Sequence, residues 1–377
     1  MLARNFAIGW VVMVGAVSLN DIVRSLQVSV AVGGQLVAVS AAVVCFGAPL
    51  IAAAVGGVDR RRFLVFTLVW YAAGHAAAAL MPSFAALLPV RAIGVLAAAA
   101  FTPQAAAALS AMTPPADRGR AITFIFLGWS IASVIGMPVH SYIGEQFGWR
   151  WAFGLVALLS APAAWWVWRT MPSGIKPAPM SFADWRQTLT HPALMGIVFV
   201  TACSAAGQFT LFSYFAPYYS IELGASALGI SMLFLWFGVF GLTGNLLLTR
   251  YIDRLGASRC VAIGLLGIAC SVLLWPLAQT AWAMALVLTP WALGCFSSNS
   301  AQQARLGAAA PGLAAALMAL NTSAMYLGQA VGAAGGGAMI AAAGFAPLPG
   351  IAMFWLAIAI GLSLWSTRML RRRSAHG

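Results

Sequence analysis

Long apolar runs, separated by short polar segments, dominate the chain. A helix that crosses a bilayer needs about 20 mostly apolar residues. By that measure the pattern predicts spans near 6–20, 33–56, 63–80, 86–110, 121–142, 150–168, 194–216, 227–249, 260–279, 281–301, 313–342 and 348–368. The first run follows MLARN and could be a signal peptide. Because Asn20-Asp21 is a poor cleavage site, we expect a retained first helix.

The longest polar interruption, residues 170–192, falls between the sixth and seventh spans and predicts a cytosolic linker between two halves. The expected domains are a six-helix bundle over 1–168, a linker over 169–193, a second bundle over 194–370 and a basic tail over 371–377. Asp59-Arg60 after the second span is echoed by Asp253-Arg254 after the eighth. Internal repetition of this kind is typical of transporters.

Composition supports the same class. The chain is 62% hydrophobic and only 7% charged, whereas about a quarter of a soluble domain is charged. The net charge of +13 would suggest nucleic acid in a soluble protein, but here it has a topological explanation. With the N-terminus inside, the outer loops hold only Arg24 and Arg150, while Arg305 and most other cations fall on the inner side. We therefore expect two cytoplasmic termini, a lipid bilayer as partner and no nucleic acid.

Motifs of enzyme chemistry are missing from the sequence. It contains no GxxxxGK[ST] loop for ATP, no HExxH and no GxSxG elbow. The five cysteines form no CxxC pair. We expect neither an enzyme, nor a cofactor, nor a metal site.

The fifth predicted span has an unusual number of helix-weakening residues. It contains, or directly precedes, Gly128, Gly136, Pro138 and Gly144. Each interior glycine costs a soluble helix about 1 kcal/mol, and a proline about 3 kcal/mol. Membrane helices tolerate both, because neighbouring helices satisfy the freed backbone groups and small residues allow close approach. The pattern predicts a helix that bends and touches another helix closely.

Arg91 is the one basic residue inside a predicted span. A charge in the bilayer is costly unless it is paired or hydrated, which favours a functional role in coupling or anion attraction. An arginine that merely holds helices in register is the alternative. His140 and His75 titrate near neutral pH and could relay protons. The simpler interpretation of each is a histidine bonded to a carbonyl group or to water.

Five stretches resemble motifs of the major facilitator superfamily, and of its twelve-helix drug and sugar efflux branch in particular. GAPLIAAAVGGVDRRR resembles the inner-loop motif, LLPVRAIG the fourth-helix arginine motif, and the stretch from Gly128 to Phe153 the fifth-helix efflux motif. QQARLGAAAP and ALNTSAMYLGQAVGAAGGG resemble the tenth-to-eleventh loop and the eleventh helix. The resemblance implies an all-α membrane fold of two pseudo-symmetric six-helix bundles, with a cavity lined chiefly by the first, fourth, seventh and tenth helices.

The resemblance also gives roles to particular residues. It implies a hinge or seal in the fifth helix, with the glycine-rich eleventh helix, including Gly328 and Gly332, as its counterpart. Polar and aromatic groups in the expected cavity helices, and at the cavity edge, are candidates for binding substrate. They are Gln208, Thr210, Tyr214, Trp291, Asn321, Tyr326 and Gln329. Helix packing is the alternative role for each of them.

The two Asp-Arg pairs resemble gating charges. Asp59 beside Arg60 lies at the start of a helix, where the dipole and nearby arginines stabilise a carboxylate. We expect Asp59 to latch the inner face, with Arg118 or Arg120 in reach, and Asp253-Arg254 to act likewise. Topology alone would explain the arginines, but it would not explain the aspartates.

The resulting hypothesis is a monomeric secondary active transporter of a bacterial inner membrane. It would export a small organic solute, drug-like or sugar, by alternating access and proton antiport. Efflux relatives commonly carry an acidic residue in the first helix, but here all seven acids fall in loops or at helix ends. An uncoupled facilitator, an uptake transporter and a non-transporting sensor or scaffold therefore remain as alternatives.

Overall fold

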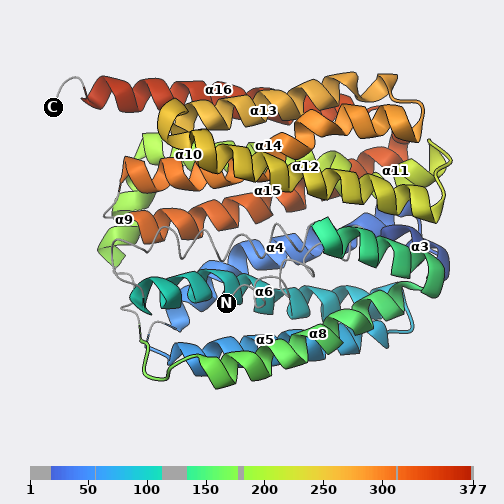
Figure 1. Ribbon diagram of the computed structural model, residues 1–377, viewed down its shortest axis with the longest axis horizontal. Helices are drawn as coiled ribbons and strands as arrows, with labels where there is room; N and C mark the ends of the chain where they lie inside the picture. Colours follow the sequence, from blue (N-terminus) through green and yellow to red (C-terminus); the bar gives the residue numbers. More distant parts are fainter. Residues whose placement is uncertain (1–17, 56, 113–133, 177–181, 311–312, 375–377) are drawn as a thin grey trace. The chain divides into compact units, whose positions relative to one another are not determined.

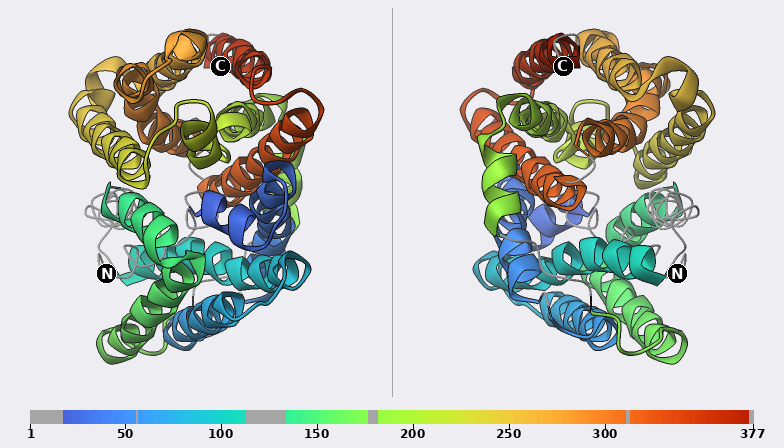
Figure 2. Two further views of the ribbon diagram at one scale, coloured as in Figure 1. Left: turned by 90° about the vertical axis from the view of Figure 1, so that its right-hand side faces the viewer. Right: turned by 90° about the vertical axis from the view of Figure 1, so that its left-hand side faces the viewer.

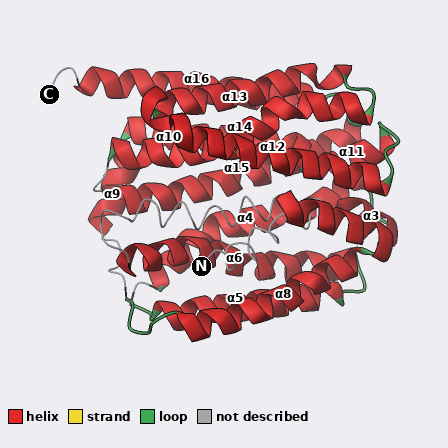
Figure 3. Ribbon diagram, in the orientation of Figure 1, coloured by secondary structure: helices red, strands yellow, loops and turns green. Residues whose placement is uncertain are grey.

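The computed structural model describes residues 18–55, 57–112, 134–176, 182–310 and 313–374. Over these ranges the regular structure is helical, and no strand occurs (Figure 3). Seven of the described helices are long and apolar enough to cross a membrane. Contacts divide the chain into an N-terminal unit, Met1–Pro179 with Phe215–Leu235, and a C-terminal unit, Met180–Tyr214 with Trp236–Gly377.

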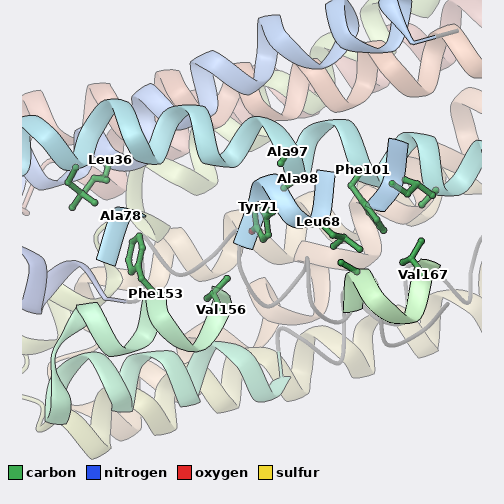
Figure 4. Packing of buried hydrophobic residues seen from close by; sticks show 14 of the residues in the cluster. Leu36, Leu68, Tyr71, Ala78, Ala97, Ala98, Phe101, Phe153, Val156 and Val167 are labelled. Atoms are coloured by element: carbon green, nitrogen blue, oxygen red, sulfur yellow. The ribbon is translucent and has the colours of Figure 1, made fainter. Parts of the chain in front are cut away.

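The N-terminal unit is built around α5. It contains α3 (Leu19–Ser25), α4 (Val30–Ala54), α5 (Arg60–Ala79), α6 (Phe84–Met112), helical residues 134–147, α8 (Trp149–Thr170), α11 (Phe215–Ile221) and the start of α12 (Ala227–Leu255). Helix α5 packs against both α6 and α8, and α4 packs against α6 (Figure 2). Tyr71, Phe153 and Val156 lie at the centre of the apolar core that these helices share (Figure 4).

The start of α8 depends on a residue from a distant helix. Gly148 precedes it with φ +99°, in the left-handed region that favours glycine. The Asp21 carboxylate then accepts a hydrogen bond from the Trp149 backbone N–H at 2.5 Å, and Ser25 Oγ accepts one from the Trp149 indole at 2.6 Å. Asp21 therefore caps the N-terminus of α8, where a negative charge is favourable.

The C-terminal unit is built around α10. It contains α9 (Phe182–Thr190), α10 (Pro192–Phe212), the remainder of α12, α13 (Ala257–Leu274), the 3₁₀ turn η2 (Trp275–Leu277), α14 (Ala281–Ala309), α15 (Ala314–Ala343) and α16 (Leu348–Ser374). Helix α10 packs against α15 and α16, and α13 packs against α14 (Figure 1). His191 Nδ1 and Thr280 Oγ1 cap α10 and α14, each accepting a backbone N–H.

Most predicted spans match helices to within a few residues, with three differences. Short helices occur at Leu19–Ser25, Phe182–Thr190 and Phe215–Ile221, none of which reaches the length of a span. Helix α14 continues to Ala309 rather than ending at 301, so Arg305 is not a loop residue as predicted. It is buried on α14 and donates hydrogen bonds to Ser363 and Thr367 of α16. Of the predicted first span, 6–20, only residues 18–20 are described, and of the predicted fifth span, 121–142, only residues 134–142.

Candidate functional site

Arg91 and His75 form a buried pair between two helices of the N-terminal unit. Arg91 lies on α6 and is 3% exposed, and His75 lies on α5 and is 1% exposed. A guanidinium nitrogen of Arg91 is 2.6 Å from His75 Nε2, and His75 Nδ1 is 2.9 Å from the Tyr71 carbonyl oxygen. A carbonyl only accepts and a guanidinium only donates. Nδ1 therefore carries the ring proton, and Nε2 accepts from Arg91.

Aromatic and small residues enclose this pair. The Arg91 guanidinium carbon lies 5.3 Å from the centroid of the Phe153 ring, within cation–π range. The His75 and Tyr71 rings are 4.4 Å apart. Beside them the backbones of α5 and α6 meet at two glycines, because a Cβ on Gly74 would lie only 2.9 Å from Gly94 Cα. The pair therefore sits where α5 and α6 approach each other closely.

His140 belongs to the same region of the N-terminal unit. Its ring is fully buried, and it interacts electrostatically with both Arg91 and His75. Both histidines are predicted proton carriers, and the structure places His75 in direct contact with Arg91. Gly136 is buried and Pro138 half-buried on the same helix. Gly144 packs against Ser18, and Gly128 lies outside the described residues.

Gln208 and Trp291 form a second polar cluster, in the C-terminal unit. Gln208 Oε1 on α10 accepts a hydrogen bond from the Trp291 indole on α14 at 3.0 Å, and Gln208 Nε2 donates to Ser204 at 3.1 Å. Ser271 Oγ accepts from the Trp291 backbone N–H at 2.8 Å. Phe237 packs edge-on against Trp291. The structure thus brings together two predicted cavity residues that lie 83 positions apart in sequence.

The remaining cavity candidates serve the contact between α10 and α15. Tyr214 donates to the Ala333 carbonyl oxygen at 2.6 Å, and Thr201 donates to Asn321 Oδ1 at 2.5 Å. Thr210 donates to a carbonyl of its own helix. Tyr326 and Gln329 are buried on α15. Among the described hydrogen bonds, the one between Trp291 and Gln208 joins two side chains that were both predicted to line the cavity.

The glycines of α15 permit this close contact. A Cβ on Gly328 would overlap the Ala202 carbonyl oxygen, and one on Gly332 would overlap the Ala206 carbonyl oxygen. Only glycine allows two backbones to approach so closely. The predicted hinge or seal residues Gly328 and Gly332 thus pack against α10, within the C-terminal unit.

Asp59 ties the start of α5 to the segment that follows α8. Its carboxylate accepts backbone hydrogen bonds from Arg62, at 3.1 Å, and from Gly174. Burial raises the pKa of this carboxyl, but the two hydrogen bonds and the charge of Arg62 outweigh burial, so the pKa lies below its ordinary value. Arg60 is buried and donates to the Val55 and Val58 carbonyl oxygens. Asp59 therefore links the inner-loop motif to the segment after α8, within the N-terminal unit.

The other gating candidates have different surroundings. Asp253 and Arg254 are exposed at the end of α12. Arg118 and Arg120, the predicted partners of Asp59, lie outside the described residues. The latch between bundles stays a prediction.

Sequence reasoning missed Asp21 and Arg305. Asp21 caps α8, and Arg24 nearby forms an ion pair with Glu145. Arg305 could have been placed on a helix, because no proline interrupts the chain between Trp291 and Pro311.

Comparison with known proteins yields one family. The model of the Major Facilitator Superfamily matches residues 5–333. The inner membrane transport protein YdhP of Escherichia coli K12 is 26% identical over 358 residues, which cover 93% of this chain and 90% of that protein. A probable sugar efflux transporter of Helicobacter pylori G27 is 26% identical over 90% of this chain and 88% of its own.

A solved structure shows the same fold. The D-xylose–proton symporter matches with a TM-score of 0.78 at 17% identity, over 97% of this chain and 95% of that chain. The predicted fold class, an all-α membrane protein with the major facilitator fold, is confirmed. The predicted superfamily is confirmed, and a sugar efflux transporter is among the relatives.

Proposed function

Because the chain belongs to the Major Facilitator Superfamily, we propose that it exports a small organic solute across the membrane in exchange for protons. It is a multi-pass transporter of the bacterial inner membrane type. In this proposal it works as a monomer by alternating access, with both termini in the cytoplasm.

The observation that carries this proposal is the match to an inner membrane transport protein and to a sugar efflux transporter along nearly the whole chain. A match that includes both halves supports a working transporter over a scaffold, because transport needs two bundles that move against each other. A chloramphenicol resistance protein of Streptomyces lividans is also 31% identical over 65% of this chain and 63% of its own. The names of these relatives favour export, with a sugar or a drug-like compound as the solute.

The two polar clusters supply groups suited to the proposed activity. Arg91 with His75 places a permanent cation beside a titratable ring inside the N-terminal unit. Gln208 with Trp291 places an amide beside an aromatic surface in the C-terminal unit. An aromatic wall with a few polar groups suits amphipathic solutes. We assign coupling to the first cluster and solute binding to the second.

The gate and hinge roles are parts of the same proposal. Asp59-Arg60 and Asp253-Arg254 would change partners as the inner face opens. The tight glycine contact of α15 would act as a rigid seal, so that α10 and α15 move together.

An uncoupled facilitator is the second candidate. The observation that favours it is the sequence of the predicted spans, which contains no acidic residue at mid-membrane depth.

Inside-out vesicles test the proposal and separate the two candidates. Radiolabelled chloramphenicol and arabinose are added to vesicles with and without the protein, and a pH gradient is imposed or collapsed with an uncoupler. The proposal predicts that the vesicles accumulate one of these solutes, or another from a wider panel of sugars and drugs, only while the gradient stands. Uptake that is the same with and without the pH gradient supports the facilitator. Failure to move any solute that demonstrably binds the protein refutes transport.

Arg91→Ala tests the coupling role assigned to Arg91. We expect gradient-driven accumulation to fall at least tenfold while the amount of inserted protein stays unchanged, because the coupling cation is lost. Arg186→Ala is the control, since Arg186 is exposed on α9 outside the predicted spans. Near-normal accumulation by Arg91→Ala would overturn the role of Arg91.

A further inference from the structure

The hydrogen bonds of His75 fix where its ring holds a proton. The Tyr71 carbonyl oxygen, 2.9 Å from Nδ1, can only accept, so Nδ1 is the donor. The Arg91 guanidinium, 2.6 Å from Nε2, can only donate, so Nε2 is the acceptor. His75 is therefore neutral in this arrangement, and the lone pair on Nε2 accepts the hydrogen bond from Arg91.

A proton on Nε2 is incompatible with that bond. It would turn the acceptor into a donor, so that two N–H groups would point at each other. It would also place an imidazolium against a guanidinium in a site that is shielded from water, where like charges repel strongly. Protonation of His75 and the hydrogen bond to Arg91 therefore exclude each other.

We propose that Nε2 of His75 is a proton-binding site, which Arg91 occupies whenever the proton is absent. Binding of a proton releases Arg91, and loss of the proton recaptures it. The proposal rests on the proposed proton antiport and identifies the group that takes the proton, in a chain whose predicted spans hold no mid-membrane acid. No covalent bond is made or broken other than that to the transferred proton.

The surroundings determine where the released cation goes. Helix α6 contributes Arg91, α5 itself contributes Tyr71, and the helix over 134–147 contributes His140. From α8 the described neighbours of the His75 ring include Phe153, which carries no titratable group. The Gly74–Gly94 contact leaves little room between α5 and α6.

Phe153 allows Arg91 to leave His75 at modest cost. The guanidinium already lies over the Phe153 ring, so a rotation away from His75 keeps its cation–π contact. Release therefore moves a positive charge from the α5–α6 interface toward Phe153 of α8. Proton binding on α5 is thereby linked to a change in the packing of α5, α6 and α8.

Nuclear magnetic resonance of the full-length protein in lipid bilayers tests the site without any solute. Histidine and arginine are labelled with nitrogen isotopes, and the resonance that disappears in His75→Gln identifies His75 among the four histidines. We expect the Nδ1–H tautomer at neutral pH, with a contact between Nε2 and the Arg91 side chain. As the pH is lowered from about 8 to about 3, the imidazolium should appear and the Arg91 contact should vanish with one shared midpoint.

Two outcomes would overturn the proposal. One is an imidazolium at His75 that keeps its contact with Arg91. The other is a His75 that stays neutral over the whole range. His376→Gln, in the predicted basic tail, is the control and should leave both the tautomer and the shared midpoint in place.

A flux measurement separates this inference from the proposed function. His75→Gln keeps an acceptor for Arg91 but cannot take a proton. For whichever of chloramphenicol and arabinose the wild type moves, we expect gradient-driven accumulation to fall at least tenfold while the amount of inserted protein stays unchanged. Full gradient-driven accumulation by His75→Gln overturns the proton site alone. A wild type that shows no gradient-driven flux overturns the antiport, while the resonance experiment still decides the behaviour of His75.

Discussion

Replacing Gly332 with alanine adds one methyl group where α15 touches α10. The new Cβ would overlap the Ala206 carbonyl oxygen and lie 2.9 Å from the Thr210 backbone nitrogen, whereas ordinary contact begins at 3.4 Å. Main-chain atoms cannot rotate away as a side chain can, so α15 has to withdraw by at least about 0.5 Å. Overpacking of this kind costs about 1–3 kcal/mol.

Gly335→Ala on the same helix is the matched control. A Cβ there meets no atom within 4 Å. Both variants gain the same helix propensity, about 1 kcal/mol, so their difference isolates the clash. We expect Gly332→Ala to be less stable than Gly335→Ala by about 1–3 kcal/mol. In a unit of this size each kcal/mol corresponds to about 2–4 °C in Tm.

Thermal unfolding of the purified full-length protein, followed by tryptophan fluorescence, measures this difference. Equal Tm values for the two variants would refute the argument that the glycine is required by close backbone approach. If Gly332→Ala is destabilised and its flux falls as well, the seal role of α15 is supported. A destabilised variant with normal flux would confine Gly332 to packing.

Three further predictions concern other contacts. Gln208→Leu removes the amide that we assign to solute binding. We expect solute affinity to fall by about 0.5–1.5 kcal/mol, the net value of one hydrogen bond, or roughly 2- to 13-fold, as measured by equilibrium binding of a transported solute. Unchanged affinity would exclude this cluster from the binding site. Thr201→Val removes the hydroxyl that donates to Asn321 between α10 and α15. We expect the free energy of unfolding to fall by about 0.6 kcal/mol, and by at most about 1.7 kcal/mol, which is measured as a small drop in Tm. A larger drop would mean that Thr201 contributes more than this hydrogen bond. Asp59→Asn should lower Tm at neutral pH. The pKa of the Asp59 carboxyl is lower in the folded protein than its unfolded value of 3.8, so the carboxylate stabilises the fold above pH 3.8 and loses that effect as the pH falls through the lowered pKa. A Tm difference between wild type and variant that does not shrink below about pH 4 would contradict this linkage.

The apolar runs were enough to place the long helices. Helices α10, α13 and α16 begin within about three residues of their predicted starts, because a bilayer span of about 20 apolar residues leaves a clear pattern. Short helices such as α3 and α11 leave no such pattern. They are held by contacts with other helices, as in the hydrogen bond from Asn20 to the Ala216 carbonyl oxygen.

The pairing of side chains between helices could not be predicted. His75 and Arg91 were both visible as unusual residues in apolar surroundings, but their contact depends on how α5 and α6 are aligned, which hydrophobic periodicity does not determine. Gln208 and Trp291 meet for the same kind of reason. Arg305 was assigned to a loop because charge counting assumes that cations avoid the membrane. In the structure, hydroxyl and carbonyl groups of α16 solvate it instead.

In the proposed antiport, solute and proton move in opposite directions through one protein. Proteoliposomes that hold a pH-sensitive dye measure both movements together. When a transported solute is added outside, we expect protons to leave as solute enters, so that the interior pH rises in the wild type and does not rise in Arg91→Ala. Solute entry by the wild type with no change in interior pH would refute the antiport.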